Sequence, residues 1–317
     1  MISEFDLIRR YFSRPTFHTD LGVGDDAALF RARSGMQLVV STDTLIAEVH
    51  FLSGTDPEDL GWKTLAVSLS DLAAMGAEPR WATLSLTLPR IDENWLNAFS
   101  NGFYACAARY NVDLVGGDTT RGPLALNVCI VGEVPAGNAI TRAGAKAGDD
   151  LWVSGLPGRA ALGLAALKKN IELNPEGEAQ CLSALHHPEP RVGLGMALRG
   201  IATAMLDISD GLAGDLRHLA ERSGVGAVIE YERLPLLPLL AAGADETTAL
   251  RCALAGGDDY ELLFTASPVH RPSLAECASL LAVPLTRIGY ITADKLLFQQ
   301  PDGHLQTLDF SGYDHFG

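Results

Sequence analysis

Apolar segments of strand length alternate with segments of helix length along most of this 317-residue chain. Residues 36–46 begin as an apolar run, and residues 80–89 alternate apolar and polar side chains, as strands do. Between them, residues 57–76 are typical of a helix, with Pro57 in the first turn and Gly76 as a stop. The other expected strands are 112–120 (running into a glycine turn), 124–134, 151–155, 202–209, 226–231, 260–266, 284–290 and 296–299. The other expected helical stretches are 92–110, 158–170, 176–199 (interrupted by "HHPEP") and 210–224. This order predicts a mixed α/β (α+β) fold in which helices cover a sheet.

A segment rich in alanine and glycine interrupts the pattern near the middle of the chain. Residues 136–150, "AGNAITRAGAKAGDD", lack the period of either a helix or a strand. Such segments commonly separate domains, and the chain is long enough for two domains of ordinary size. We therefore expect two domains, residues 1–137 and residues 138–317.

Charge and cysteine content exclude several classes of protein. With 24 basic and 39 acidic residues, the net charge is -15, which disfavours binding to nucleic acid or to an anionic membrane surface. No apolar run approaches the roughly 18 residues of a membrane-spanning helix. The five cysteines are odd in number and form no CxxC pair, so neither a disulfide framework nor a structural zinc site is indicated. A reducing, cytoplasmic location is expected.

The first twelve residues, "MISEFDLIRRYF", carry acids early and lack the apolar stretch of a signal peptide. Their apolar residues are spaced as on a helix. We expect a short amphipathic helix with Ile2, Phe5, Ile8 and Phe12 on one side.

Aspartates follow apolar strands at four places: "GVGDD", "VVSTD", "LVGGD" and "MLDISD". A single such aspartate is ordinary turn or cap chemistry. However, α/β folds place their chemistry at the ends of strands. Four junctions of the same kind therefore predict a cluster of carboxylates.

Asp71 lies within a helix whose other residues are mostly apolar or small. Thr64, Ser68 and Asp71 are spaced by four and three residues, which places them in one polar stripe. An ionised carboxylate is rarely buried without a partner. Either a hydrogen bond to a neighbouring segment or a metal ion shared with other acids would provide that partner.

Oxygen ligands such as Asp, Ser and Thr suit a hard cation, and Mg²⁺ combines a few carboxylates with water and phosphate. Ca²⁺ is the competitor, although the chain lacks a twelve-residue calcium loop, and the histidines lack zinc spacing. No GxxxxGK[ST] or strand–helix GxGxxG motif is present. The acids beside Gly22 and Gly24 therefore indicate a site for metal ions, and these ions would in turn bind phosphates. A non-enzymatic, acidic metal-binding protein is an alternative.

A series of phrases resembles thiamine-monophosphate kinases, in order and through nearly the whole chain. They are "GVGDDAAL", "STDTLIAEVHF", "SLSDLAAMGAEP", "GGDTTRG", "TRAGAKAGD", "DISDGLAGDL", "GGDDYELLF" and "GYDHF". That family belongs to the superfamily of aminoimidazole ribonucleotide synthetase and selenophosphate synthetase. The resemblance implies a homodimer. It also implies an N-terminal metal- and ATP-binding domain, whose mixed sheet and helices form a dimerising half-barrel, and a C-terminal α/β sandwich that completes the ATP and substrate site.

The implied reaction transfers the γ-phosphoryl group of ATP to thiamine monophosphate, with several Mg²⁺ ions. By motif match, the metal ligands are Asp26, Ser41, Thr42, Asp43, Asp71, Asp118, Asp207 and Asp210, of which Asp207 and Asp210 are also the catalytic residues. The implied nucleotide contacts are Gly117, Asp118, Arg142 and Ser209, and the implied substrate contacts are His50, Asp258 and Tyr313.

The chain departs from the family pattern at Asp258, where the family often has Glu. The alternative function is that of another ATP-dependent superfamily member, a synthetase or a hydrogenase-maturation enzyme. Selenophosphate synthetase would require a reactive Cys or selenocysteine near the N-terminus, whereas the first cysteine here is Cys106.

Overall fold

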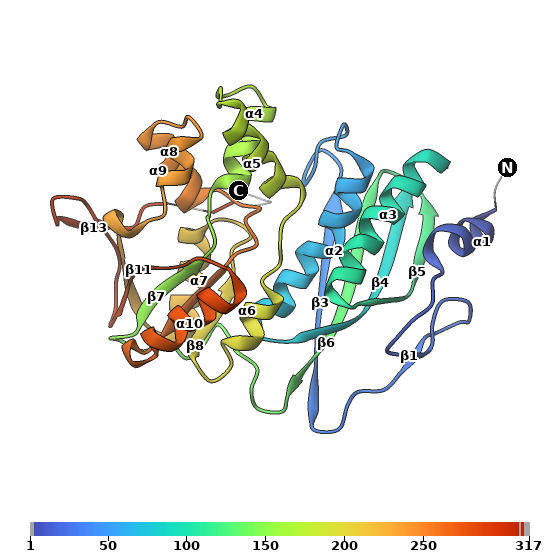
Figure 1. Cartoon of the computed structure of the whole chain (residues 1–317), viewed down its shortest axis with the longest axis horizontal. Helices are drawn as coiled ribbons and strands as arrows, with labels where there is room; N and C mark the ends of the chain where they lie inside the picture. The colour runs from blue at the N-terminus through green and yellow to red at the C-terminus, as the bar shows by residue number, and fades with distance from the viewer. Residues whose placement is uncertain (1–2, 311, 314–317) are drawn as a thin grey trace. The chain divides into compact units, whose positions relative to one another are not determined.

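The computed structural model describes residues 3–310, 312 and 313 (Figure 1). The chain divides into two compact units. Unit 1 consists of Met1–Leu72 and Ala77–Gly137, and unit 2 consists of Ala73–Gly76 and Asn138–Gly317. Each unit has its own sheet and helices.

Unit 1 is built on a four-stranded mixed sheet in the order β3-β6-β4-β5. Its strands are β3 (Met36–Ile46), β4 (Glu78–Leu88), β5 (Asp113–Arg121) and β6 (Ala125–Pro135). Strand β6 is antiparallel to both β3 and β4, whereas β4 and β5 are parallel. A short antiparallel ribbon of β1 (Thr19–Leu21) and β2 (Leu29–Phe30) precedes the sheet.

Helices α2 (Pro57–Ala74) and α3 (Glu93–Tyr110) cover one face of this sheet (Figure 1). The alternation of strand side chains explains the arrangement, since Leu84 and Leu86 of β4 are buried while Thr83 and Ser85, which alternate with them, stay partly exposed. On β3, the exposed positions include three apolar residues: Leu38, Val40 and Ile46 are 49%, 61% and 41% exposed. One face of the sheet therefore forms the core of unit 1, and the other face is open.

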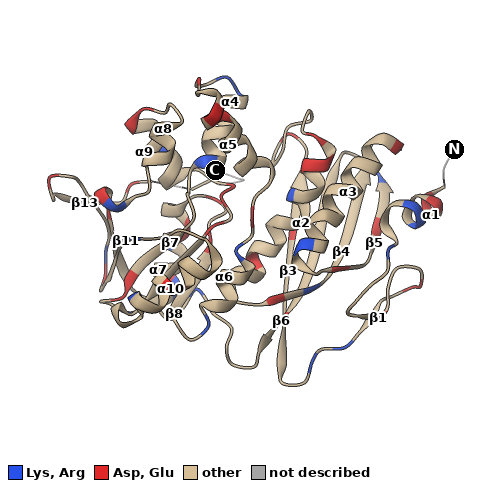
Figure 2. Cartoon of the chain, viewed as in Figure 1, with Lys and Arg blue, Asp and Glu red and all other residues tan. Residues whose placement is uncertain are grey.

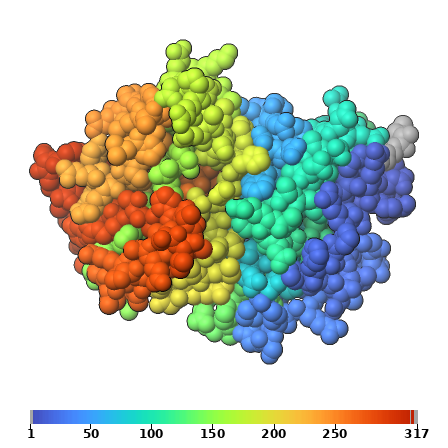
Figure 3. Space-filling model, viewed as in Figure 1, coloured from blue at the N-terminus to red at the C-terminus, as the bar shows by residue number. Residues whose placement is uncertain are grey.

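The N-terminal segment differs from its prediction. A single turn, α1 (Glu4–Leu7), continues into a π-helical turn, η1 (Ile8–Phe12), which packs on α3 (Figure 3). The buried residues are Leu7, Tyr11 and Phe12, whereas Phe5 is 74% exposed. The expected apolar side of Ile2, Phe5, Ile8 and Phe12 is therefore wrong for Phe5, because the wider π turn changes which side chains face inward. Ile2 lies outside the described residues.

Unit 2 contains a seven-stranded sheet in the order β13-β12-β9-β11-β7-β10-β8, antiparallel except for the parallel pair β9 and β12. The strands are β7 (Asp150–Ser154), β8 (Ala202–Asp207), β9 (Gly226–Glu230), β10 (Leu262–Ala266), β11 (Leu285–Thr292), β12 (Leu296–Gln299) and β13 (Leu305–Thr307). The helices are α4 (Arg159–Leu167), α5 (Pro175–His186), α6 (Val192–Ala197), α7 (Leu212–Ser223), α8 (Leu237–Ala241), α9 (Glu246–Ala255) and α10 (Arg271–Leu281), with 3₁₀ turns η2 (Tyr231–Arg233) and η3 (Pro268–His270). A continuous apolar core joins the sheet to α4, α5, α7, α8 and α9.

Helices α2 and α3 cross so closely that glycine is required on both. A Cβ on Gly102 would lie 1.8 Å from the carbonyl oxygen of Glu58, and one on Gly61 would lie 2.0 Å from that of Phe99. We predict that Gly102→Ala lowers the free energy of unfolding by about 1–3 kcal/mol, because the helices must move apart. Urea unfolding measures the change. Gly54→Ala is the matched control, since nothing lies within 4 Å of its Cβ position; equal losses in both variants would contradict the packing argument.

Candidate active site

The polar stripe predicted on the helix around Asp71 faces the sheet of unit 1. Ser68 Oγ donates a hydrogen bond to Asp43 Oδ2 at 2.7 Å, and Ser41 Oγ donates one to the carboxylate of Asp71. The prediction is confirmed for Ser68 and Asp71, whereas Thr64 donates at 2.6 Å to Leu60 within its own helix. Helix α2 and strand β3 thus hold two carboxylates and two hydroxyl groups together.

The charges of Asp43 and Asp71 repel one another. Burial first, and then the neighbouring Asp71 carboxylate, raises the pKa of Asp43 to about 6, while the hydrogen bond from Ser68 lowers it. A cation between the two carboxylates would remove this repulsion, so the donor set fits Mg²⁺. Across the described chain, no group of three or more His, Cys, Asp or Glu residues is arranged to hold a metal ion. Two carboxylates and two hydroxyl groups could supply only part of a ligand shell, which would suit an ion that retains water and phosphate ligands.

Thr42 and Asp118 lie on the opposite, open face of the sheet. Asn127 Nδ2 donates to Thr42 Oγ1 at 3.1 Å. In the strand register, Ser85 lies beside both Asn127 and Asp118, so Asp118 is on the same face as Thr42. Because strand side chains alternate between faces, Thr42 points away from the side that holds Asp43. The structure therefore brings Ser41, Asp43 and Asp71 together but places Thr42 and Asp118 on the other face.

Strand β5 continues through the "GGD" sequence, so the turn expected there is wrong. Gly117 has a φ of 151°, and a Cβ on it would lie 1.8 Å from the Leu84 carbonyl oxygen. The glycine allows the strand to run close to β4 rather than to end. Asp43 and Asp118 consequently lie within strands and not after them, as the sequence pattern had predicted.

The remaining predicted residues of unit 1 lie in connections. Asp26 is exposed in the loop between β1 and β2, where its backbone N–H donates to Asp25 Oδ1 at 2.9 Å. His50 lies in the turn after β3, and its Nδ1 accepts from the Ile46 N–H at 3.0 Å.

In unit 2, a second group of predicted residues surrounds the loop between β8 and α7. Asp207 is buried at the end of β8, and Ser209 Oγ donates to Asp210 Oδ2 at 3.4 Å. Asp258 donates its N–H to the Ser209 carbonyl at 2.9 Å, and Tyr313 donates its N–H to the Asp210 carbonyl at 2.9 Å. The predicted catalytic, nucleotide and substrate residues of this unit thus lie close together.

Sequence reasoning missed the residue that shapes this loop, Asp215 in the first turn of α7. Its Oδ2 accepts the N–H groups of Ser209 and Asp210 at 3.2 and 3.3 Å. Burial first, and then the Asp210 carboxylate, raises the pKa of Asp215 to about 6, while these N–H groups and exposed Arg142 lower it. In the sequence, the signal for this role was an acid in the first turn of the helix that follows "DISDG".

A second missed residue is Asp259. It accepts the Gly158 N–H at 2.7 Å at the start of α4, and burial raises its pKa well above the usual value. Its neighbours Asp258 and Tyr260 both have left-handed backbones, with φ of 68° and 51°, and the Tyr260 hydroxyl donates to Asp258 Oδ1 at 3.1 Å. This anchoring fixes the conformation of the segment that carries Asp258.

Two family models match the chain: AIR synthase related protein, N-terminal domain, over residues 24–134, and AIR synthase related protein, C-terminal domain, over residues 146–298. These matches define the class and confirm the predicted α/β (α+β) fold. Thiamine-monophosphate kinase of Salmonella typhimurium is 48% identical over 99% of this chain and 98% of its own. The chain belongs to the thiamine-monophosphate kinase family.

Solved structures agree with this assignment. The crystal structure of thiamine-monophosphate kinase from Stenotrophomonas maltophilia K279a has a TM-score of 0.84 and 47% identity, and the match covers 91% of this chain and 92% of that one. The complex of AaThiL with AMPPCP and TMP has a TM-score of 0.78 and 31% identity, covering 93% and 92%.

The raised pKa of Asp43 predicts how stability depends on pH in the metal-free protein. The folded protein holds this proton more tightly than the unfolded chain, so the stabilisation is present below pH ~4 and is lost as pH rises to about 6. At pH 7.5, Asp43→Asn should raise the free energy of unfolding by about 1–3 kcal/mol, and at pH 4 it should change it little. Urea unfolding at both pH values in EDTA measures this; an equal effect at the two pH values would contradict it.

Proposed function

We propose that this chain transfers the γ-phosphoryl group of ATP to thiamine monophosphate, giving thiamine diphosphate and ADP. The observation that carries the proposal is the 48% identity, over nearly the full length of both chains, to a thiamine-monophosphate kinase. The complex of the structural relative with AMPPCP and TMP supports the same pair of ligands. Another ATP-dependent superfamily activity is not favoured, because the relatives from Haemophilus influenzae and Bacillus subtilis, 41% and 38% identical over 99% of this chain, also carry the name thiamine-monophosphate kinase.

We assign the binding of Mg²⁺ in unit 1 to Asp43 and Asp71, assisted by Ser41. Their repulsion and partial burial support this role. By motif match, we propose further Mg²⁺ ligands within each unit: Asp26, Thr42 and Asp118 in unit 1, and Asp207 and Asp210 in unit 2. Bound Mg²⁺ would neutralise phosphate charge, which a protein with net charge -15 must otherwise oppose.

The contacts to ATP and to the substrate are proposed from the same motif match. Gly117, Asp118, Arg142 and Ser209 contact the nucleotide, and His50, Asp258 and Tyr313 contact thiamine monophosphate. The hydrogen bonds that join Asp258 to Ser209 and Tyr313 to Asp210 around the β8–α7 loop support these proposed roles.

The proposed mechanism is a direct in-line transfer without a phosphorylated enzyme. The acceptor phosphate has a second pKa of about 6, so it is mostly a dianion near neutral pH and needs no general base. An oxygen of that phosphate attacks the γ-phosphorus as the bond to the ADP oxygen breaks. The role of the protein is then to position two anions and to balance their charge, with Asp207 and Asp210 acting as metal ligands at the reacting groups.

A homodimer in the cytoplasm is the proposed assembly and location. The open face of the unit 1 sheet, with exposed Leu38, Val40 and Ile46, supports a contact between two copies. All five cysteines are free, which suits a reducing compartment. No helix among residues 3–310 is long and apolar enough to cross a membrane. In the view of Figure 2, Lys and Arg are scattered over both units, and no nucleic-acid partner is proposed.

The first test is a coupled assay of ADP release. With ATP and Mg²⁺, thiamine monophosphate should stimulate ADP release, whereas thiamine should not, because its alcohol would need a base to remove a proton. Identification of thiamine diphosphate as the product completes the test. Equal stimulation by thiamine would contradict the proposed chemistry, and no stimulation by either compound would contradict the proposed function.

The second test concerns Asp71. We predict that Asp71→Asn lowers kcat by about 100-fold or more in saturating Mg²⁺, because the variant loses a charged metal ligand while keeping the shape of the side chain. Asp92→Asn is the matched control: Asp92 caps α3 by accepting the N–H groups of Asn94 and Trp95, and asparagine caps a helix equally well. Activity of Asp71→Asn equal to that of the control would show that Asp71 is not a metal ligand.

A further inference from the structure

The loop that carries Asp26 has little structure of its own. Residues 24–27 are exposed, and the hydrogen bond from the Asp26 N–H to Asp25 is local. The flanking strands β1 and β2 span only three and two residues, with an irregular register between them. A two-stranded ribbon of this size is at best marginally stable by itself. The position of the loop must therefore be set by contacts with the rest of unit 1.

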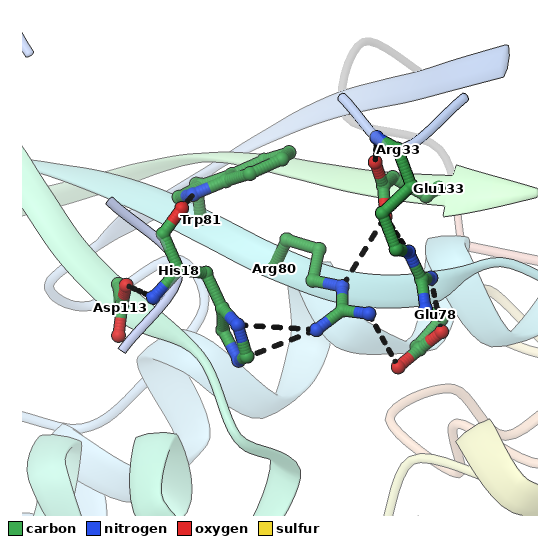
Figure 4. Close-up of polar contacts among 7 residues, drawn as sticks. All are labelled: His18, Arg33, Glu78, Arg80, Trp81, Asp113 and Glu133. Atoms are coloured by element: carbon green, nitrogen blue, oxygen red, sulfur yellow. Dashed lines mark hydrogen bonds and ion pairs between the residues drawn. The ribbon is translucent and has the colours of Figure 1, made fainter. Parts of the chain in front are cut away.

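Asp113 provides the main contact at the start of the ribbon (Figure 4). Its carboxylate accepts the N–H of Phe17 at 2.9 and 3.0 Å, the N–H of His18 at 2.6 Å and the hydroxyl of Thr19 at 2.7 Å. The side chain is 4% exposed. Burying a carboxylate is costly unless its oxygens are hydrogen-bonded, and here every donor comes from the segment that leads into the loop.

The sheet also holds the chain where it leaves the loop. The ring of Phe30 stacks on Trp81 at 4.2 Å, and Trp81 Nε1 donates to the His18 carbonyl at 3.0 Å, which joins the two ends of the ribbon. Beyond β2, Arg33 donates its N–H and its Nε–H to Glu133, both at 2.6 Å. Figure 4 shows the contact of Trp81 with His18 and that of Arg33 with Glu133.

We propose that Asp113 is a positioning residue, which fixes the loop of residues 22–28 and so places Asp26 for its role as a ligand to Mg²⁺. The proposal rests on the metal role of Asp26 given above. Asp113 begins strand β5, which also carries Gly117 and Asp118, so a single strand holds the segment that leads to Asp26 and carries the proposed nucleotide residues of unit 1.

The test compares Asp113→Asn with Asp149→Asn. Asp149 is the matched control in unit 2: it is 5% exposed and accepts one backbone N–H, from Lys146 at 3.0 Å, and one hydroxyl, from Thr203 at 2.7 Å. In the ligand-free protein, Asp113→Asn should speed hydrogen exchange across residues 17–28 by about tenfold, because hydrogen bonds to a charged acceptor are lost. Asp149→Asn should leave exchange there unchanged. Unchanged exchange in Asp113→Asn would overturn the proposal.

Kinetics then test whether anchoring acts through Asp26. Asp113→Asn should raise the KM for MgATP by about tenfold and lower kcat by a smaller factor, and in an Asp26→Asn background it should raise KM no further. Independent, additive effects of the two substitutions would overturn this inference alone. A normal KM for MgATP in Asp26→Asn by itself would instead overturn the metal role of Asp26, and the inference with it.

Discussion

The repulsion between Asp43 and Asp71 is the constraint on which the site of unit 1 depends. One carboxylate comes from a strand and the other from the helix that covers it, and each accepts a hydrogen bond from a serine on the opposite element. These two bonds hold the charges together but do not neutralise them, since the pKa of Asp43 stays raised. The fold thus supplies the energy that keeps the pair in place, and a cation bound between the two carboxylates, as proposed, would relieve their repulsion.

In unit 2, two buried carboxylates accept hydrogen bonds from backbone N–H groups instead of serine hydroxyls. Asp215 holds the N–H groups of Ser209 and Asp210, and Asp259 holds that of Gly158. In both cases a buried carboxylate that does not itself belong to the proposed site determines the path of a loop that does. Asp113 in unit 1 has the same character. Buried acids in this chain therefore serve two purposes, and only some of them are candidates for metal binding.

Features that depend on helical or strand periodicity were predicted from the sequence. Features that depend on contacts between residues far apart in the chain were mostly not. The stripe of Ser68 and Asp71 was predictable because helical spacing alone places the two residues on one side. The role of Asp113 was not recognised because the donors to it lie 94 to 96 residues away along the chain. Asp215 was also missed, although its donors lie only five and six residues away. An acid within the apolar run "VDLVGG" was nonetheless a signal of the same kind as Asp71. The turn predicted at Gly117 failed because glycine there permits a close approach of strands, which a sequence cannot distinguish from a turn.

Strand β3 lies at the edge of its sheet and contributes to both faces, with Asp43 beneath the helices and Val40 and Thr42 on the open side. Its pairing with β6 runs through eleven consecutive residue pairs from Met36 to Ile46. Sliding β3 by a single residue would exchange the two faces, bringing threonines under α2 and turning the carboxylate outward. Insertions and deletions within this strand should consequently be far less tolerated during evolution than changes of length in the loop before it.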